Sequence, residues 1–245
     1  MNGKKNGKAK EFAKDGKLKF EGEYLNGKRN GKGKEYNFGD LVFEGGYLNG
    51  ERNGNGKEYY NNDKLKFEGE YLNGKRDGKG KEYNYEGILV FVGEYLNGKR
   101  NRKGKEYNFN GKLIFEGEYF NGERNGKGKE YYSNGKLKFE GEYFNGGIWN
   151  GKGYNEEGII EFDIKEGNGK IKEYYYNDIC KFEGEYLNGK RNGIGKEYDN
   201  NGKLEFEGEY LNGKRNGKGK EYYDGKLAFE GKYLDGQRYE KCQIF

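Results

Sequence analysis

Aromatic residues and glycines alternate with charged residues along most of the chain, in a pattern that recurs every 23 or 24 residues. The stretch from Phe206 to Tyr222 reads FEGEYLNGKRNGKGKEY. In it Phe206, Gly208 and Tyr210 fall at every second position, and glutamates fill the places between them. Because successive side chains of a strand point to opposite faces, this alternation predicts a β-strand with one apolar and one solvated face. In a helix, each glycine would cost about 1 kcal/mol relative to alanine.

Each repeat is predicted to form one β-hairpin. Two Asn-Gly pairs lie between Asn212 and Gly217, and such pairs are strong turn signals because both residues tolerate positive φ. We expect a wide reversal there, with the GxG glycines as part of its turn geometry, and a tight reversal at Asp224-Gly225. Consecutive hairpins predict an all-β fold, an elongated, single-layer, twisted antiparallel meander of nine to ten hairpin repeats, which is solenoid-like. Each ring is expected to pack against the same ring one repeat along.

The repeats divide one continuous array into five stretches. The phenylalanine that marks each good copy stands at Phe20, Phe43, Phe67, Phe91, Phe115, Phe139, Phe182, Phe206 and Phe229. The predicted stretches are an N-terminal half repeat (1–16), regular repeats (17–145), a degenerate segment (146–181), regular repeats (182–234) and a C-terminal cap (235–245).

The degenerate segment contains the only tryptophan of the chain, Trp149. One interpretation is a tolerated defect that bends the array. The other is a docking point, in which an exposed Trp149 beside Ile159 and Ile160 anchors a partner. Ile244 and Phe245 are further docking candidates, because an uncovered sheet edge invites pairing.

Composition leaves disorder and a folded array as interpretations of the whole chain. Leu, Ile, Val and Phe make up 44 of the 245 residues, a share that is typical of disordered chains. Against disorder, aromatic residues reach 17% and the net charge is only +5. Proline is absent, which suits central strands, because each residue there needs its backbone N–H for the ladder. A one-dimensional stack of aromatic hairpins fits these values without a deep core.

The residue types exclude most catalytic chemistry. The chain has no His and no Thr, and Ser133 is its only serine. A Ser-His or Cys-His nucleophilic pair and a His-ligated zinc site are therefore excluded. Carboxylates are abundant, but they recur in nearly every copy, whereas an active site needs one distinctive pair. We predict no enzyme activity, no metal and no cofactor, and we expect Cys180 and Cys242 to be free thiols.

Basic residues follow the Asn-Gly pairs and are predicted to line one edge of the array. The candidates for contact with anions or lipids are Lys28, Arg29, Lys75, Arg76, Lys99, Arg100, Lys190, Arg191, Lys214 and Arg215. Stacked hairpins would space them by about 10 Å, as a ladder that could meet lipid phosphates. The alternative is that they are solvated turn residues balanced by nearby glutamates. Nucleic-acid readout is disfavoured, since the aromatic residues belong to the buried stripe.

The elements YxGxYxNGKxxGxG, KEYY and NGKL resemble the MORN repeat, in the variant form that occurs in bacteria and viruses. The resemblance covers nearly the whole chain. It implies a twisted single-layer sheet with one hairpin per repeat, and roles in scaffolding, partner binding or dimerisation, with a contested link to acidic phospholipids. In the common MORN pattern a tyrosine stands two residues after the second glycine of GxG. Here Glu35, Glu58 or Glu82 stands there, so the aromatic groove is expected to be lined differently.

Three functions follow as hypotheses. The first is a non-enzymatic scaffold that binds other proteins, or a second copy of itself, through its β-repeat surface or terminal edges. The second is peripheral binding to acidic membranes through the basic edge. The third, implied by the resemblance to the variant repeat, is an antitoxin-like neutraliser of a partner protein. No leader and no long apolar run is visible, so we expect an intracellular, cytoplasmic location, with membrane or cytoskeletal association or a place in a viral particle as alternatives.

Overall fold

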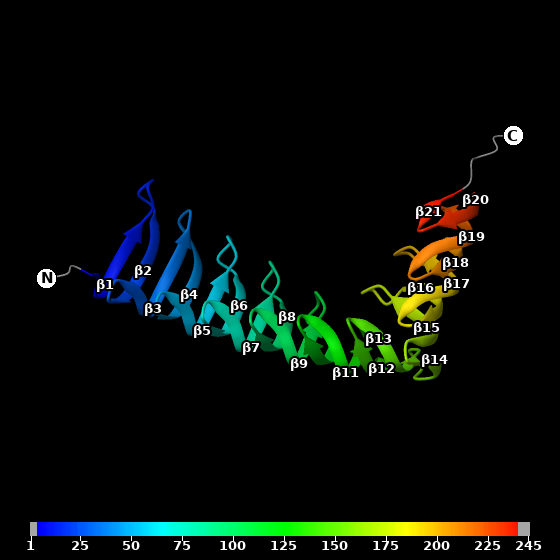
Figure 1. The fold of residues 1–245 in the computed structure, drawn as a ribbon, viewed down its shortest axis with the longest axis horizontal. Helices are drawn as coiled ribbons and strands as arrows, with labels where there is room; N and C mark the ends of the chain where they lie inside the picture. Colours follow the sequence, from blue (N-terminus) through cyan, green and yellow to red (C-terminus); the bar gives the residue numbers. More distant parts are fainter. Residues whose placement is uncertain (1–3, 240–245) are drawn as a thin grey trace. The chain divides into compact units, whose positions relative to one another are not determined.

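A computed structural model describes residues 4–239, and every regular element within them is a β-strand (Figure 1). The predicted all-β class is therefore confirmed. The chain divides into two compact units, one ending at Glu123 and one beginning at Arg124, and each is described by itself. Two predicted docking residues, Ile244 and Phe245, lie outside the described residues.

The first unit contains ten consecutive strands. They are β1 (Gly7–Phe12), β2 (Leu18–Leu25), β3 (Lys28–Asn37), β4 (Asp40–Leu48), β5 (Glu51–Tyr59), β6 (Leu65–Leu72), β7 (Lys75–Tyr83), β8 (Leu89–Leu96), β9 (Lys99–Tyr107) and β10 (Leu113–Phe120). Each strand pairs antiparallel with the next, so the unit is an up-and-down meander of hairpins, as predicted. Figure 1 shows these hairpins following one another from blue to green.

The second unit repeats this plan, and the division between the units falls at the start of β11. Its strands are β11 (Glu123–Tyr131), β12 (Leu137–Phe144), β13 (Gly147–Tyr154), β14 (Ile160–Lys165), β15 (Asn168–Tyr174), β16 (Cys180–Leu187), β17 (Lys190–Tyr198), β18 (Leu204–Leu211), β19 (Lys214–Tyr223), β20 (Lys226–Leu234) and β21 (Gln237–Arg238). Each of these strands also pairs antiparallel with the next.

The two kinds of turn differ from the prediction. The first Asn-Gly pair of each repeat is the tight reversal, because Asn26 and Gly27 have φ of 52° and 82° and join β2 directly to β3. The other reversal is longer in most hairpins; before β2, the N–H of Ala13 donates to the carbonyl of Lys17 at 2.8 Å. The first glycine of GxG lies inside the return strand, where Gly31 has φ of 82° and forms a bulge. The expectation that GxG is turn geometry is therefore wrong.

Arg102 occupies the bulge position of β9, where most hairpins have glycine. Its φ is 56°, a left-handed conformation that costs a residue with a side chain about 1 kcal/mol. Its exposed side chain forms an ion pair with Glu94 at 3.5 Å, and exposed pairs of this kind contribute little stability. Strand β9 therefore carries local strain that the glycine bulges avoid.

A row of glycines crosses the first unit. It runs from Gly22 in β2 to Gly117 in β10, with one glycine per strand, each opposite the next. A side chain does not fit in this row. A Cβ added to Gly69 would lie 2.6 Å from the carbonyl oxygen of Lys79 and 2.7 Å from the ring of Phe67.

The phenylalanine of each hairpin lies over this glycine row and is enclosed although the sheet has one layer. Phe67 is 0% exposed. Its ring meets Tyr71 of its own hairpin and Tyr95 of the next edge to face, with ring centroids 5.7 and 5.2 Å apart. The guanidinium of Arg76 covers the ring at 4.0 Å. The stacking therefore joins Phe to Tyr of the next repeat, rather than Phe to Phe as expected, and each hairpin needs its neighbour to complete its core.

The segment predicted to be degenerate still forms the paired strands β13, β14 and β15. Ile164 and Ile171 enter the row that glycines fill elsewhere, and both are buried. Lys138 forms an ion pair with Asp178 at 2.7 Å and lies 4.7 Å from each of two tyrosine rings. These partners are 40 residues apart, whereas in regular hairpins a turn reaches the turn of the next repeat, 23 residues along. The turn at Ser133 and Asn134 therefore reaches two later turns, since Ser133 donates to Asp178 at 2.7 Å and Asn134 donates to Glu156 at 2.6 Å.

Candidate binding groove

The register assigns different side chains to the two faces of the sheet. We call one the core face; in the first full hairpin it carries Phe20, Tyr24, Arg29 and Glu35. We call the other the groove face; there it carries Glu21, Glu23, Lys32 and Lys34. The solvated glutamates predicted between the aromatic residues thus lie on the groove face. The glutamate of each KEY motif lies on the core face instead, because Phe20 is directly opposite Glu35.

On the core face a chain of ion pairs links the hairpins of the first unit. Arg76 donates to Glu58 of the preceding hairpin at 2.7 Å and to Glu82 of its own hairpin at 2.9 Å. Each glutamate also meets the arginine of the neighbouring hairpin. We call this series the arginine ladder, and in the first unit it comprises Glu11, Arg29, Glu35, Arg52, Glu58, Arg76, Glu82, Arg100 and Glu106. A second series comprises Glu173, Arg191, Glu197, Arg215, Glu221 and Arg238.

The ladder favours the charged form of the Glu58 carboxylate. Burial alone would raise the pKa of Glu58, but hydrogen bonds from Arg76 and Tyr71, together with the charges of Arg76 and Arg52, outweigh burial and hold this pKa below its ordinary value. The Tyr71 hydroxyl donates to Glu58 at 2.7 Å. Burial and this hydrogen bond raise the pKa of Tyr71, so the phenol stays neutral. The charges of Arg76, Glu58 and Glu82 are therefore paired within the core face, whereas the hydroxyls of Tyr47 and Tyr95 are buried without a hydrogen-bond partner among the described residues.

The arginines predicted to meet phosphates belong to this ladder. Arg29, Arg76, Arg100, Arg191 and Arg215 are half-buried, and each guanidinium lies 4.0 or 4.1 Å from a phenylalanine ring. Their guanidiniums are engaged in ion pairs and ring contacts inside the fold, and contact of this edge with an anion or a lipid stays a prediction. The signal that sequence reasoning missed is a glutamate 18 residues before each arginine.

The lysines of the predicted basic edge do remain exposed. Lys28, Lys75, Lys99, Lys190 and Lys214 lie directly after the Asn-Gly turns. Exposed leucines precede the same turns, among them Leu25, Leu72 and Leu96. In the first unit, backbone hydrogen bonds connect successive turns, as between the N–H of Gly98 and the carbonyl of Arg76 at 2.8 Å. We call this row of lysines and leucines the turn edge.

The predicted docking residues of the degenerate segment do not come together. Trp149 is half-buried near the start of β13, with its ring centroid 5.4 Å from that of Phe144. Ile159 and Ile160 follow the opposite end of β13 and are 63% and 50% exposed. The expectation of an exposed Trp149 beside these isoleucines is therefore wrong, and a docking role for any of the three stays a prediction.

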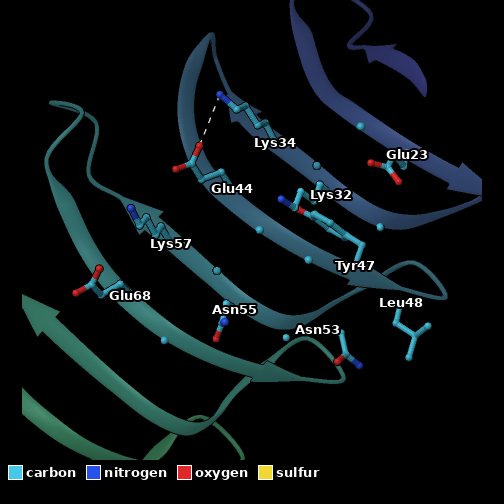
Figure 2. Close-up of a pocket in the computed structure, with 18 of the residues that line it drawn as sticks. Glu23, Lys32, Lys34, Glu44, Tyr47, Leu48, Asn53, Asn55, Lys57 and Glu68 are labelled. Carbon is cyan, nitrogen blue, oxygen red and sulfur yellow. Dashed lines mark ion pairs between the residues drawn. The ribbon is translucent and has the colours of Figure 1, made fainter. Parts of the chain in front are cut away.

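A groove of 1630 Å³ crosses the groove face of the first unit (Figure 2). Its lining reaches from Lys8 in β1 to Glu94 in β8 and includes the backbone of the glycine row. Seven strand spacings of about 4.8 Å give a length of roughly 34 Å. An extended polypeptide of about ten residues has this length, at roughly 3.3 Å per residue.

One wall of the groove alternates in charge. Along it lie Lys10, Glu21, Lys34, Glu44, Lys57, Glu68 and Lys81, each opposite the next on neighbouring strands. Ion pairs join Lys34 to Glu44 at 3.6 Å (Figure 2) and Lys81 to Glu68 at 3.1 Å. Glu44 also accepts a hydrogen bond from Tyr59 at 2.6 Å, which is the main cause that lowers the pKa of Glu44. A wall of alternating sign does not suit a polyanion, because glutamates lie between the lysines.

We expect the free energy of unfolding to be nearly constant from about pH 6 to 8 and to fall below about pH 4.5. The chain has no histidine to titrate in the flat range. The pKa values of Glu44 and Glu58 are lower in the folded than in the unfolded chain, so the unfolded chain takes up protons first. Their stabilisation is present above the ordinary carboxyl pKa and is lost as the pH falls through the folded pKa.

Urea unfolding followed by circular dichroism at several pH values measures this dependence. The comparison variant is Glu58→Gln, which has no proton to gain at this position. Its stability must fall less between about pH 5 and 3 than that of the unmodified chain. Equal losses in the two proteins would contradict the assigned role of Glu58.

The fold and the groove define a class of protein, a repeat array of consecutive β-hairpins whose aromatic core lies between neighbouring repeats. Among residues 4–239, no group of three or more His, Cys, Asp or Glu side chains is placed to hold a metal ion. The same residues form no helix long and apolar enough to cross a membrane.

Comparison with known families assigns the chain. The family described as "MORN repeat" matches residues 20–37, 67–87, 91–112, 115–136 and 206–226, and "MORN repeat variant" matches residues 5–26, 52–73 and 191–212. Together the matches cover more than half of the chain, which therefore belongs to the MORN-repeat family. This is a non-catalytic repeat family whose repeats generally mediate interactions with proteins or membranes.

Other comparisons add little. No curated protein matches the chain significantly. A solved structure described as "Crystal Structure of TcdB2-TccC3-TEV" is 10% identical over 94% of this chain and 13% of that chain, with a TM-score of 0.16. A likeness this weak carries no argument about fold or function.

Proposed function

We propose that this chain is a non-enzymatic scaffold that holds a polypeptide segment of a partner protein in the groove of its first unit. The observation that carries the proposal is the groove itself, 1630 Å³ in volume and lined by residues of eight successive strands. The core face is occupied by aromatic packing and by the arginine ladder. The groove face offers backbone, lysines and glutamates along a path of roughly 34 Å.

The lining favours a polypeptide over a lipid or a nucleic acid. A segment that carries both acidic and basic side chains can pair with both kinds of charge on the wall, whereas an anionic surface would meet the glutamates. The amide side chains of Asn53 and Asn55 also line the groove. An amide both donates and accepts hydrogen bonds, which matches the N–H and C=O groups of a peptide backbone.

Selection from a displayed library of random peptides about ten residues long tests the proposal. Enriched peptides are synthesised, and their binding to the full chain is measured by fluorescence anisotropy. We expect the double variant Lys34→Ala/Lys57→Ala, which removes two charges from the wall, to bind at least about tenfold more weakly. The matched control is Lys28→Ala/Lys75→Ala, which removes two charges from the turn edge and should bind like the unmodified chain.

Three outcomes would contradict the proposal. They are a selection without enriched peptides, equal binding by both double variants, and loss of binding only in the turn-edge variant. A vesicle-pelleting experiment tests the alternative that the chain binds acidic membranes. If the chain pellets with phosphatidylserine vesicles, and the turn-edge variant or moderate salt abolishes pelleting, the interaction belongs to the turn edge rather than to the groove.

A further inference from the structure

One hairpin of the first unit lacks a side chain that the others supply. Strand β4 contains FEGGYL, whereas four other copies read FEGEYL. Gly46 therefore stands where β2, β6 and β8 have Glu23, Glu70 and Glu94. The hairpin formed by β4 and β5 lies in the middle of the groove.

In regular hairpins this glutamate folds over the bulge glycine of the return strand. A Cβ added to Gly78 would lie 2.9 Å from the carboxyl carbon of Glu70. The same carboxylate accepts the backbone N–H of Lys79 at 3.3 Å. In the second unit, Glu209 accepts the N–H of Lys218 in the same way at 3.2 Å. The glutamate thus supplies an acceptor to a backbone amide that the bulge turns toward the groove face.

The β4–β5 hairpin has no such cover among residues 4–239. A Cβ added to its bulge glycine, Gly54, would meet no atom within 4 Å. The next residue, Asn55, corresponds to Lys79, and no carboxylate of the described residues accepts its N–H. The place that a carboxylate fills in neighbouring hairpins is therefore open to the groove here.

A cation lies beside this place. Lys32 of β3 is directly opposite Gly46, whereas the corresponding Lys79 is opposite Glu94. Lys32 is exposed, and within the described part of the chain it forms no ion pair. Figure 2 shows Lys32, Asn53 and Asn55 along this part of the groove.

We propose that the groove binds an acidic side chain of its partner, Glu or Asp, at the β4–β5 hairpin. The partner's carboxylate would take the place of the glutamate that other hairpins supply themselves, accepting the N–H of Asn55 and facing the ammonium of Lys32. This inference rests on the proposed function, since it names the chemistry of the segment that the groove holds. It also sets the register of that segment, because neighbouring hairpins fill the equivalent place with their own glutamates.

Nuclear magnetic resonance of the full ¹⁵N-labelled chain tests the subsite. The probe is N-acetylglutamate methylamide, and the matched control is N-acetylglutamine methylamide. We expect saturable shifts of the Gly54 and Asn55 amide signals with the glutamate probe alone. The variant Lys32→Gln should weaken this response severalfold, because it removes the cation and keeps a polar side chain in its place.

A second variant is designed to create the same subsite in another hairpin. Its result does not depend on whether a substitution disturbs the β4–β5 hairpin. Filling the place by Gly46→Glu is unsuitable, because a Cβ there would overlap the carbonyl oxygen of Asn53. The variant Glu23→Gly instead uncovers Gly31 in the preceding hairpin, where Lys8 lies opposite residue 23 as Lys32 lies opposite Gly46. We expect it to create a second responsive site, seen as new shifts at Gly31 and Lys32 with the glutamate probe.

The outcomes separate this inference from the proposed function. Shifts with both probes, shifts with neither, or no new site in Glu23→Gly would overturn the inference. Peptides that the library selection identifies as groove binders give a further test. Replacing their Glu or Asp residues by Gln or Asn should weaken binding about tenfold. Groove binding that ignores these replacements would keep the proposed function and remove the carboxylate subsite.

Discussion

Replacing Gly69 with Val is expected to lower the free energy of unfolding by about 3 kcal/mol, the upper end of the usual cost of overpacking. The first added atom would lie 2.6 Å from the carbonyl oxygen of Lys79 and 2.7 Å from the ring of Phe67. The carbonyl belongs to the paired backbone of β7 and cannot rotate away. The strands must therefore separate, or the ring must leave the site that Tyr71 and Tyr95 enclose.

Urea unfolding at neutral pH measures this effect, with Lys66→Val as the control. Lys66 lies on the same strand, β6, but is exposed. Valine favours strands, so this control should change stability by less than about 0.5 kcal/mol. If the two variants unfold at the same urea concentration, the glycine row can accommodate a side chain, and steric exclusion by the packed rings does not explain why its residues are glycine.

Replacing Arg76 with Met is expected to cost about 2–4 kcal/mol. Methionine keeps an apolar stem over Phe67 but leaves Glu58 and Glu82 without the guanidinium between them. The side chains of Arg76 and Glu58 are 18% and 17% exposed, so water compensates the loss only in part. The cost should be larger than that of breaking a surface ion pair, which is typically about 0.5 kcal/mol.

The matched control is Arg102→Met, at an arginine whose side chain is 78% exposed. Thermal unfolding should hardly distinguish this control from the unmodified chain. A double-variant cycle with Glu58→Gln isolates the pair, and we expect a coupling of at least about 1 kcal/mol between Arg76 and Glu58. Additive effects of the two substitutions would show that the arginine ladder is not a stabilising element.

The strands could be predicted from the sequence because their signal is local. Phe206, Gly208 and Tyr210 alternate with glutamates within one strand, and the period of the repeat indicates how the strands stack. The turns are harder to predict, because both Asn-Gly pairs have the same composition. Only the register shows that the pair at Asn212 reverses the chain while Gly217, with φ of 93°, forms a bulge within β19.

The arginine ladder could not be predicted, because its partners are brought together only by the pairing of strands. Arg76 stands among turn residues in the sequence, and its acceptor Glu58 lies 18 residues earlier in another hairpin. For the same reason the basic residues look equivalent in the sequence. The structure separates them: Arg76 lies on the core face over Phe67, whereas Lys75 beside it is exposed to solvent.

The groove is partly visible in the sequence. The change from FEGEYL to FEGGYL at Gly46 can be read from the sequence. The uncovered bulge glycine that results from it could not be predicted, because only the structure shows that Glu70 folds over Gly78 in a regular hairpin. The glutamate of the KEY motif also departs visibly from the common MORN pattern. On the core face Glu35 stands in this place and forms ion pairs with Arg29 and Arg52.

The central claim is that the two faces of the sheet have different roles: the core face stabilises the fold, and the groove face binds a partner. The most direct test uses a peptide from the library selection that carries a spin label and is bound to the ¹⁵N-labelled chain. The spin label broadens the amide signals of nearby residues, so the lost signals show where the peptide lies. The account predicts that signals from Gly33, Gly45 and Gly56 disappear while those of Lys28 and Lys75 persist. Loss of the signals at the turn edge, with the glycine row unaffected, would contradict the account.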